Sequence, residues 1–210
     1  MTEIPSTKTL YFDESGFTGY NLLDPKQPIF VVASADFGPE SAADILAESF
    51  PRYRGAEYKF SNIWRSNNKA GLVRFGEKLP DTNKLAFTWI VDKRFLVLTK
   101  IVDFLIEPYI TDTGYDFYAD GFCWKYTNYI HFGLTQYGPS ALYDSLLHAY
   151  QTFSRNPNLK TLGILQSQLR IMSNSTEEPI QIFLEQMALG AELFTQYKNI
   201  ATFNTNTNYT

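Results

Sequence analysis

All three strand-like segments of this chain lie before residue 93, and the residues after it are patterned as helices. The apolar runs 8–14, 28–36 and 85–92 are rich in the β-branched and aromatic residues that strands favour. The second run is apolar without interruption, which predicts a strand buried on both faces. Turn residues in 18–27 predict that the first two strands form a hairpin.

Helix start and stop signals account for the rest of the chain. Expected helices cover 39–50, a segment from Ser61 or Asn62 to Leu79, 94–107, 115–136, 139–154, 160–172 and 177–197. The helix that ends near Leu79 is expected to bury a face containing Trp64 and Phe75. Pro108 and Gly114 are among the predicted breaks.

This order of elements predicts an α/β fold with a small, about three-stranded sheet in the N-terminal half and a mostly helical C-terminal half. We expect a strand-rich core over 1–93, a helical region over 94–200 and a polar tail over 201–210. Three strands make a small sheet for so many helices. We therefore expect a missing C-terminal part or a partner chain to complete the fold.

Charge is distributed unevenly along the sequence. Residues 52–100 hold 11 of the 18 lysines and arginines but only four of the 22 acids, so this segment carries a net charge of +7. Such a segment suits a polyanionic substrate, or it forms a solvated basic face. The single Cys123 excludes an internal disulfide, and the sequence has no signal core or membrane-length apolar run. The chain is expected to be cytoplasmic.

The first strand is expected to be short and buried, and it runs directly into two acids, Asp13 and Glu14, and then into the turn residues Ser15 and Gly16. Because strand side chains alternate, the two carboxylates point to opposite faces, and at most one faces a given site. Asp13 is either a metal ligand at a strand end or a cap for its own turn.

A second acid, Glu57, lies two residues before Lys59, so in extended chain both side chains point the same way. Such a pair can combine a metal ligand with a phosphate contact, or it is a surface ion pair. Asp92, at the end of the third strand, is better placed to cap the following helix than to bind metal.

Other chemistries have weaker signals. His131 and His148 lie on separate expected helices without metal-ligand spacing, so both are expected to be structural, and Cys123 is expected to be a core thiol. Eight aromatic residues between Tyr115 and Phe132 are spaced as a core or interface face, with base stacking as the alternative.

Taken in order, three motifs resemble the bacterial family called domain of unknown function 3800. They are Tyr11-Phe12-Asp13-Glu14-Ser15-Gly16, Glu57-Tyr58-Lys59-Phe60-Ser61 and Val91-Asp92-Lys93-Arg94-Phe95. The resemblance covers most of the chain and implies a ribonuclease-H-like fold with metal-dependent nuclease activity. It makes Asp13 the central strand carboxylate and Glu57 the second acid, with Lys59 beside it and Glu14 as part of the signature.

The resemblance predicts that Asp13, Glu57 and Lys59 are catalytic and that Asp13, Glu57 and Glu14 hold Mg²⁺ or Mn²⁺. Lys59, Arg65, Lys69 and Lys93 are expected to contact DNA or RNA. The family's later Gln-x-Ala-Asp pattern is missing, because Gln186-Met187-Ala188 is followed by Leu189. Two carboxylates hold Mg²⁺ weakly, so this chain alone is expected to have little or no activity.

Two other functions stay open. One is a non-catalytic binding or regulatory module that docks a partner protein or self-associates through its sheet edge and helices. The other is a metal-dependent phosphoesterase that acts on nucleotides through the same residues.

Overall fold

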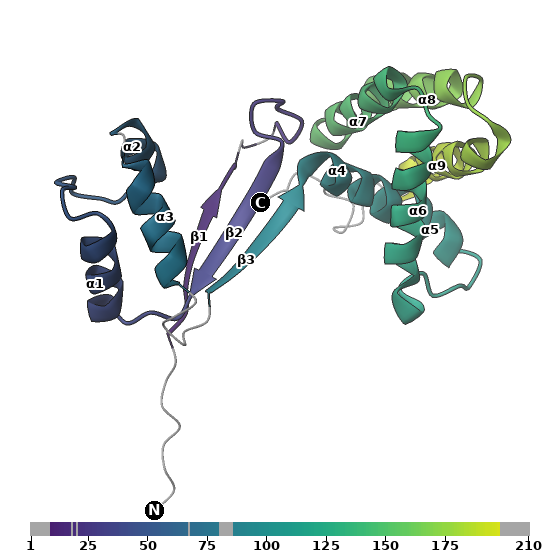
Figure 1. Cartoon of the computed structure of the whole chain (residues 1–210). Helices are drawn as coiled ribbons and strands as arrows, with labels where there is room; N and C mark the ends of the chain where they lie inside the picture. Colours follow the sequence, from purple (N-terminus) through teal and green to yellow (C-terminus); the bar gives the residue numbers. More distant parts are fainter. Residues whose placement is uncertain (1–8, 18, 20, 67, 80–85, 198–210) are drawn as a thin grey trace, which may run out of the picture. The chain divides into compact units, whose positions relative to one another are not determined.

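The computed structural model describes residues 9–17, 19, 21–66, 68–79 and 86–197. These residues form an α/β structure, as predicted, with a small antiparallel sheet and a larger number of helices (Figure 1). No helix within the described ranges is long and apolar enough to span a membrane.

The chain divides into two compact units, and each is described by itself. Unit 1 consists of Met1–Ser15 and Val31–Ile90, and unit 2 of Gly16–Phe30 and Val91–Thr210. The division after Ile90 lies near the boundary expected at residue 93, but residues 16–30 belong to the helical unit. The expected polar tail, 201–210, lies outside the described residues.

The sheet consists of β1 (Tyr11–Ser15), β2 (Ile29–Ala35) and β3 (Ala86–Asp92), in the order β1-β2-β3. β1 and β2 are antiparallel, with Tyr11 opposite Ala35 and Ser15 opposite Val31, so the pairing predicted for these strands is confirmed. Figure 1 shows β3 antiparallel to β2 as well. β1 and β3 are therefore the two edges of the described sheet.

Unit 1 also contains α1 (Pro39–Ser49), α2 (Phe60–Arg65) and α3 (Lys69–Lys78). The prediction of one helix up to Leu79 is wrong, because the chain leaves the helix after Arg65 and enters a new one at Lys69. Ser66 and Asn68 bond locally instead, with the Asn68 amide donating to the Ser66 hydroxyl over 3.0 Å. Trp64, predicted to be buried, is 50% exposed.

The prediction that β1 and β2 are buried is also wrong. All five residues of β1 are exposed, and in β2 Ile29 and Ala33 are exposed while the others are half-buried. A sheet with apolar residues on both faces needs a covering layer on each. Helices α1 and α3 leave a cavity of about 450 Å³ against the sheet, so even the face they cover is not closely packed.

Unit 2 is helical, as predicted. Its elements are α4 (Lys93–Ile101), the π-helical turn η2 (Val102–Ile106), α5 (Glu107–Thr111), the 3-10 turn η3 (Ala119–Gly121), α6 (Phe122–Gln136), α7 (Ser140–Arg155), α8 (Leu159–Ser173) and α9 (Glu178–Tyr197). Figure 1 shows that the C-terminal helices gather around α4 and α6.

Two predicted helix limits in unit 2 are wrong. Pro108 does not interrupt the helical path, because the π-helical turn lets it occupy the first turn of α5, where a missing N–H costs little. The helix expected from residue 115 begins only at Phe122. Asp120 and Gly121 have positive φ angles of 52° and 67°, which no α-helix accommodates.

The core of unit 2 is one continuous apolar cluster contributed by every long helix. Its fully buried members include Val97, Leu98, Leu105, Leu134, Leu146, Leu147, Leu165 and Met187. The 16–30 segment joins it through Leu22, whose backbone N–H donates to the Gln151 side chain over 2.8 Å.

Helix α9 lies against the π-helical turn at Gly190. A Cβ atom placed on Gly190 would overlap the backbone carbonyl of Leu105. Leu105 lies in η2 and Gly190 in α9. The absence of a side chain at Gly190 therefore sets how near α9 can lie to η2.

Candidate functional site

The two acids of the first motif lie where the sequence predicted, on opposite faces of β1. Asp13 is opposite Ala33 and lines the cavity between the sheet and helices α1 and α3, together with Phe75 and Phe87. Glu14 is opposite Val32. Both residues are exposed.

Glu57 and Lys59 lie in the segment before α2, and their side chains do point the same way. The Lys59 ammonium is 3.1 Å from a Glu57 carboxylate oxygen, and both side chains are more than half exposed. The Tyr53 hydroxyl donates to the Glu57 carbonyl over 2.7 Å. Glu57 is not among the residues that line the cavity at Asp13. The pair therefore has the geometry of the surface ion pair that the sequence left as an alternative.

The predicted basic contacts divide between the two units. Arg65 ends α2 and is exposed, and the ammonium of Lys69 lies 4.4 Å from the centre of the Trp64 ring. Lys93 differs, because it belongs to unit 2 and is only 1% exposed. Burial lowers the pKa of its ammonium, and the nearby Asp24 carboxylate opposes that shift. Lys93 lines a second cavity, of about 470 Å³, together with Asp24 and Asp144, and a phosphate contact by Lys93 would have to reach into that cavity.

Metal ligation requires several carboxylates or imidazoles within reach of one ion. Within the described ranges, no three or more histidine, cysteine, aspartate or glutamate side chains gather in a group that could hold a metal ion. The residues expected to bind Mg²⁺ therefore do not form a metal site by themselves.

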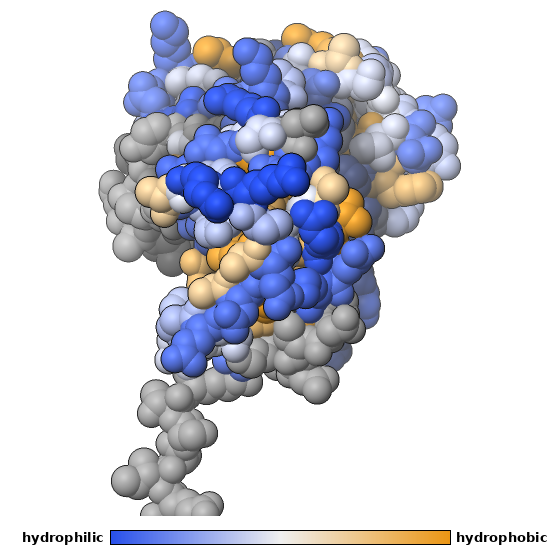
Figure 2. Space-filling model, turned by 60° about the vertical axis from the view of Figure 1, so that its left-hand side comes forward, coloured by the Kyte–Doolittle hydropathy of each residue, from blue (hydrophilic) through white to orange (hydrophobic). Residues whose placement is uncertain are grey.

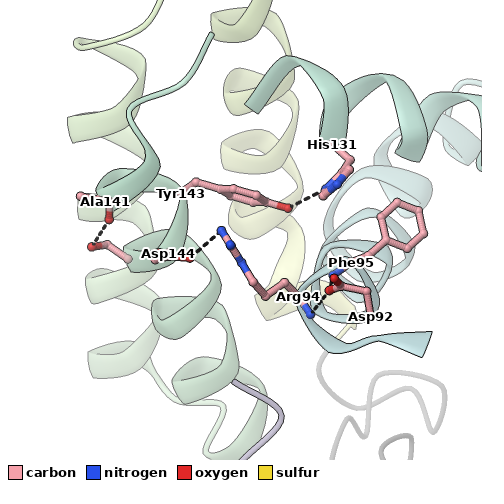
Figure 3. Close-up of polar contacts among 8 residues, drawn as sticks. Asp92, Arg94, Phe95, His131, Ala141, Tyr143 and Asp144 are labelled. Carbon is pink, nitrogen blue, oxygen red and sulfur yellow. Dashed lines mark hydrogen bonds and ion pairs between the residues drawn. The ribbon is translucent and has the colours of Figure 1, made fainter. Parts of the chain in front are cut away.

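A polar cluster lies at the start of α4 (Figure 3), and the sequence predicted only part of it. As predicted, Asp92 caps the helix, and its carboxylate accepts the backbone N–H groups of Arg94 and Phe95 over 2.8 and 3.0 Å. The Arg94 guanidinium lies 2.7 Å from the Asp144 carboxylate and 5.2 Å from the centre of the Tyr143 ring. These partners lie on α7, about fifty residues away in sequence, and no local pattern predicts them.

His131 of α6 completes this cluster. Its Nδ1 atom lies 3.2 Å from the Tyr143 hydroxyl, and its ring meets Phe95 edge to face. Burial lowers the pKa of His131 and raises that of Tyr143. Together with Arg94, these two side chains tie α4, α6 and α7 to one another. The His131 ring thus contributes to the packing between these helices.

Large apolar side chains reach the solvent on all three strands of the sheet. Phe12 is 69% exposed, Phe87 61%, Trp89 67% and Ile90 66%. The strands contain the acids Asp13, Glu14 and Asp92 and no lysine or arginine. We call β1, β2 and β3 together the open sheet. Figure 2 shows hydrophobic atoms reaching the surface between hydrophilic ones.

Comparison of the chain with protein-family models, with curated proteins and with solved structures finds no match. The resemblance to the domain of unknown function 3800 therefore stays a prediction that rests on the three sequence motifs.

Proposed function

We propose that the chain is a binding module that docks an extended, basic segment of another protein on its open sheet. The observation that carries this proposal is the exposure of Phe12, Phe87, Trp89 and Ile90 by more than 60% each on the same small sheet. Isolated exposed apolar residues are ordinary, whereas several large ones on the edge strands of one small sheet favour an interaction surface.

β1 lies at the edge of the sheet, where a strand from a partner can pair with it. The outer side of an edge strand presents unpaired N–H and C=O groups, and an incoming extended segment pairs with them as a further strand. All five β1 residues are exposed, so the described chain leaves this edge accessible. Side chains of the incoming strand would then pack beside Phe12 on one face and Tyr11 on the other.

The negative charge of the open sheet favours a basic partner. The open sheet carries acids without a compensating cation, so lysine or arginine opposite Asp13 and Glu14 is favourable. A second copy would bring its own Asp13 and Glu14 to the same edge, and like charges on adjacent strands repel. A nucleic acid would meet the same repulsion from its phosphates. A basic polypeptide with apolar residues between its cations would match both the acids and the exposed apolar side chains of the open sheet.

A peptide titration tests the proposal. A capped peptide of alternating valine and lysine is expected to bind saturably, whereas its valine–glutamate counterpart is not. The lysines of such a strand all lie on one face and can pair with only one of the two acids, so the double substitution Asp13→Asn, Glu14→Gln is expected to weaken binding up to about fivefold, since one cross-strand charge pair contributes up to ~1 kcal/mol. Isothermal titration calorimetry measures both affinities.

The matched control is Glu40→Gln, Asp44→Asn on α1, which makes the same change of charge on exposed residues of unit 1 outside the open sheet. This variant is expected to bind the lysine peptide like the unaltered chain. Equal weakening in both double variants would show that net charge alone drives binding and would contradict docking on β1. Equal binding of the lysine and glutamate peptides would also overturn the proposal.

A second candidate function is a ribonuclease-H-like, Mg²⁺- or Mn²⁺-dependent nuclease. The observation that favours it is the exposed Asp13 carboxylate, which lies on an edge strand where an added strand could bring further ligands. The described residues do not supply a full ligand set, so this function needs acids from outside them. The same residues would serve a nucleotide phosphoesterase.

The full natural gene product is the right material for testing this second candidate. It is expected to cleave DNA or RNA in the presence of Mg²⁺ or Mn²⁺, and Asp13→Asn is expected to reduce the cleavage rate at least a hundredfold, while Glu40→Gln leaves it unchanged. A magnitude of roughly this size follows when a metal ligand that stabilises the transition state is lost. Undiminished cleavage by Asp13→Asn would exclude Asp13 from the active site.

A further inference from the structure

A second surface site lies in unit 2, where four aromatic rings surround a cavity of about 270 Å³. Tyr129 and Phe132 come from α6, Tyr137 follows that helix, and Phe183 comes from α9. The carboxylate-bearing Glu177, just before α9, also lines the cavity and is exposed. The cavity therefore combines an aromatic wall with one negative charge.

The four rings form two edge-to-face pairs. Tyr129 and Phe183 meet edge to face with their centres 5.5 Å apart and their planes at 71°. Phe132 and Tyr137 form a second such pair, with centres 6.1 Å apart and planes at 77°. The planes within each pair are nearly perpendicular, so the rings of a pair do not stack face to face, and all four line the cavity.

These rings are not explained by the core of unit 2. Phe183 is 9% exposed and belongs to the core, whereas Tyr129, Phe132 and Tyr137 are 61%, 55% and 62% exposed. Burying such rings is strongly favourable, so leaving three of them around one cavity points to a ligand. The sequence alternative of base stacking fits poorly, because the Glu177 carboxylate repels the phosphates of a nucleic acid.

We propose that this cavity binds a small organic cation with a quaternary ammonium headgroup. The faces of aromatic rings carry negative electrostatic potential and attract cations, and aromatic cages of this kind suit quaternary ammonium groups. The Glu177 carboxylate adds a charge of the right sign. A quaternary ammonium has no N–H donors, so the aromatic wall leaves none of its hydrogen bonds unmade, whereas a primary ammonium has three donors to satisfy. The volume lies just below the usual range for small-ligand sites, which suits a compact headgroup.

Choline and its neutral isostere 3,3-dimethylbutan-1-ol test the proposal directly. The two molecules share a shape and differ by the charge. Titration of the chain into each ligand, followed by the proton NMR signal of the ligand methyl groups, is expected to show an upfield, saturable shift for choline, because the methyl groups lie over ring faces. The isostere is expected to bind at least about fivefold more weakly. Equal affinities would reveal a merely apolar cavity and overturn the proposal, as would the absence of any choline shift.

Two substitutions locate the site, and each has a matched control. Glu177→Gln and Phe132→Leu are each expected to weaken choline binding at least about threefold. Glu178→Gln changes the adjacent exposed acid, and Trp124→Leu changes a ring of α6 that is 61% exposed and does not line the cavity. Both controls are expected to keep full affinity.

The outcome is decisive even if Phe132→Leu folds poorly, because Glu177→Gln alters one exposed, nearly isosteric side chain. Unchanged choline affinity in a folded Glu177→Gln variant, or equal losses in Trp124→Leu and Phe132→Leu, would overturn the assignment of this cavity.

Discussion

Replacing Gly190 with alanine is expected to lower the free energy of unfolding by about 3 kcal/mol or more, at the upper end of what overpacking a core costs. The added Cβ would overlap the backbone carbonyl of Leu105. A backbone atom cannot move aside as a side-chain end can, so α9 has to shift away from the π-helical turn. Such a shift loosens Leu105 and Met187, both fully buried, and urea denaturation followed by circular dichroism measures the loss.

Gly163→Ala is the control for this experiment. Gly163 lies in the interior of α8, and a Cβ atom there would meet no other atom within 4 Å. Alanine is better than glycine in a helix interior by about 1 kcal/mol, so this variant is expected to be more stable than the unaltered chain. A Gly190→Ala variant as stable as Gly163→Ala would mean that α9 and η2 do not meet at Leu105.

Amide hydrogen exchange is expected to differ between the two units by about a thousandfold or more. Protection follows buried apolar contacts. The apolar cluster of unit 2 includes fully buried residues from α4, η2, α6, α7, α8 and α9. Within the described part of unit 1, the buried apolar side chains are Phe37, Phe50 and Ile63, and the strands of the open sheet are largely exposed.

Exchange measured by mass spectrometry on peptic fragments would locate this difference. Fragments from α7 and α8 are expected to exchange slowly and fragments from β1, α1 and α3 quickly. Addition of the valine–lysine peptide is expected to slow exchange in β1 and to leave α8 unchanged. Uniform exchange across the chain would indicate one cooperative core and contradict the division into two units.

Local signals in the sequence predicted the elements that depend on local chemistry. Asp92 was identified as a cap because a side-chain oxygen at a strand–helix junction accepts the next backbone N–H groups, and it does so here. The three strands and the order of helices followed from periodicity. Pro108 was misjudged because the cost of proline depends on its place within a turn, and the π-helical turn before it was not visible in the pattern.

Burial was harder to predict than secondary structure. An apolar run such as Ile29–Ala35 indicates that a strand can be buried on both faces, but it does not say whether the chain supplies two covering layers. The same limit affects the candidate sites. Glu57 and Lys59 were correctly expected to face the same way, since that is local geometry, whereas the Arg94–Asp144 pair and the aromatic cavity depend on helix packing.

The acids of β1 also affect whether copies of the chain can add to one another edge to edge. An accessible edge strand is a template on which identical strands can add without limit, as in a fibril. Asp13 and Glu14 place two negative charges within the five residues of that strand. Each further copy would therefore meet like charges at the growing edge, whereas the basic segment proposed above would neutralise them. The same two acids that would favour a basic partner would thus oppose the stacking of identical chains on β1.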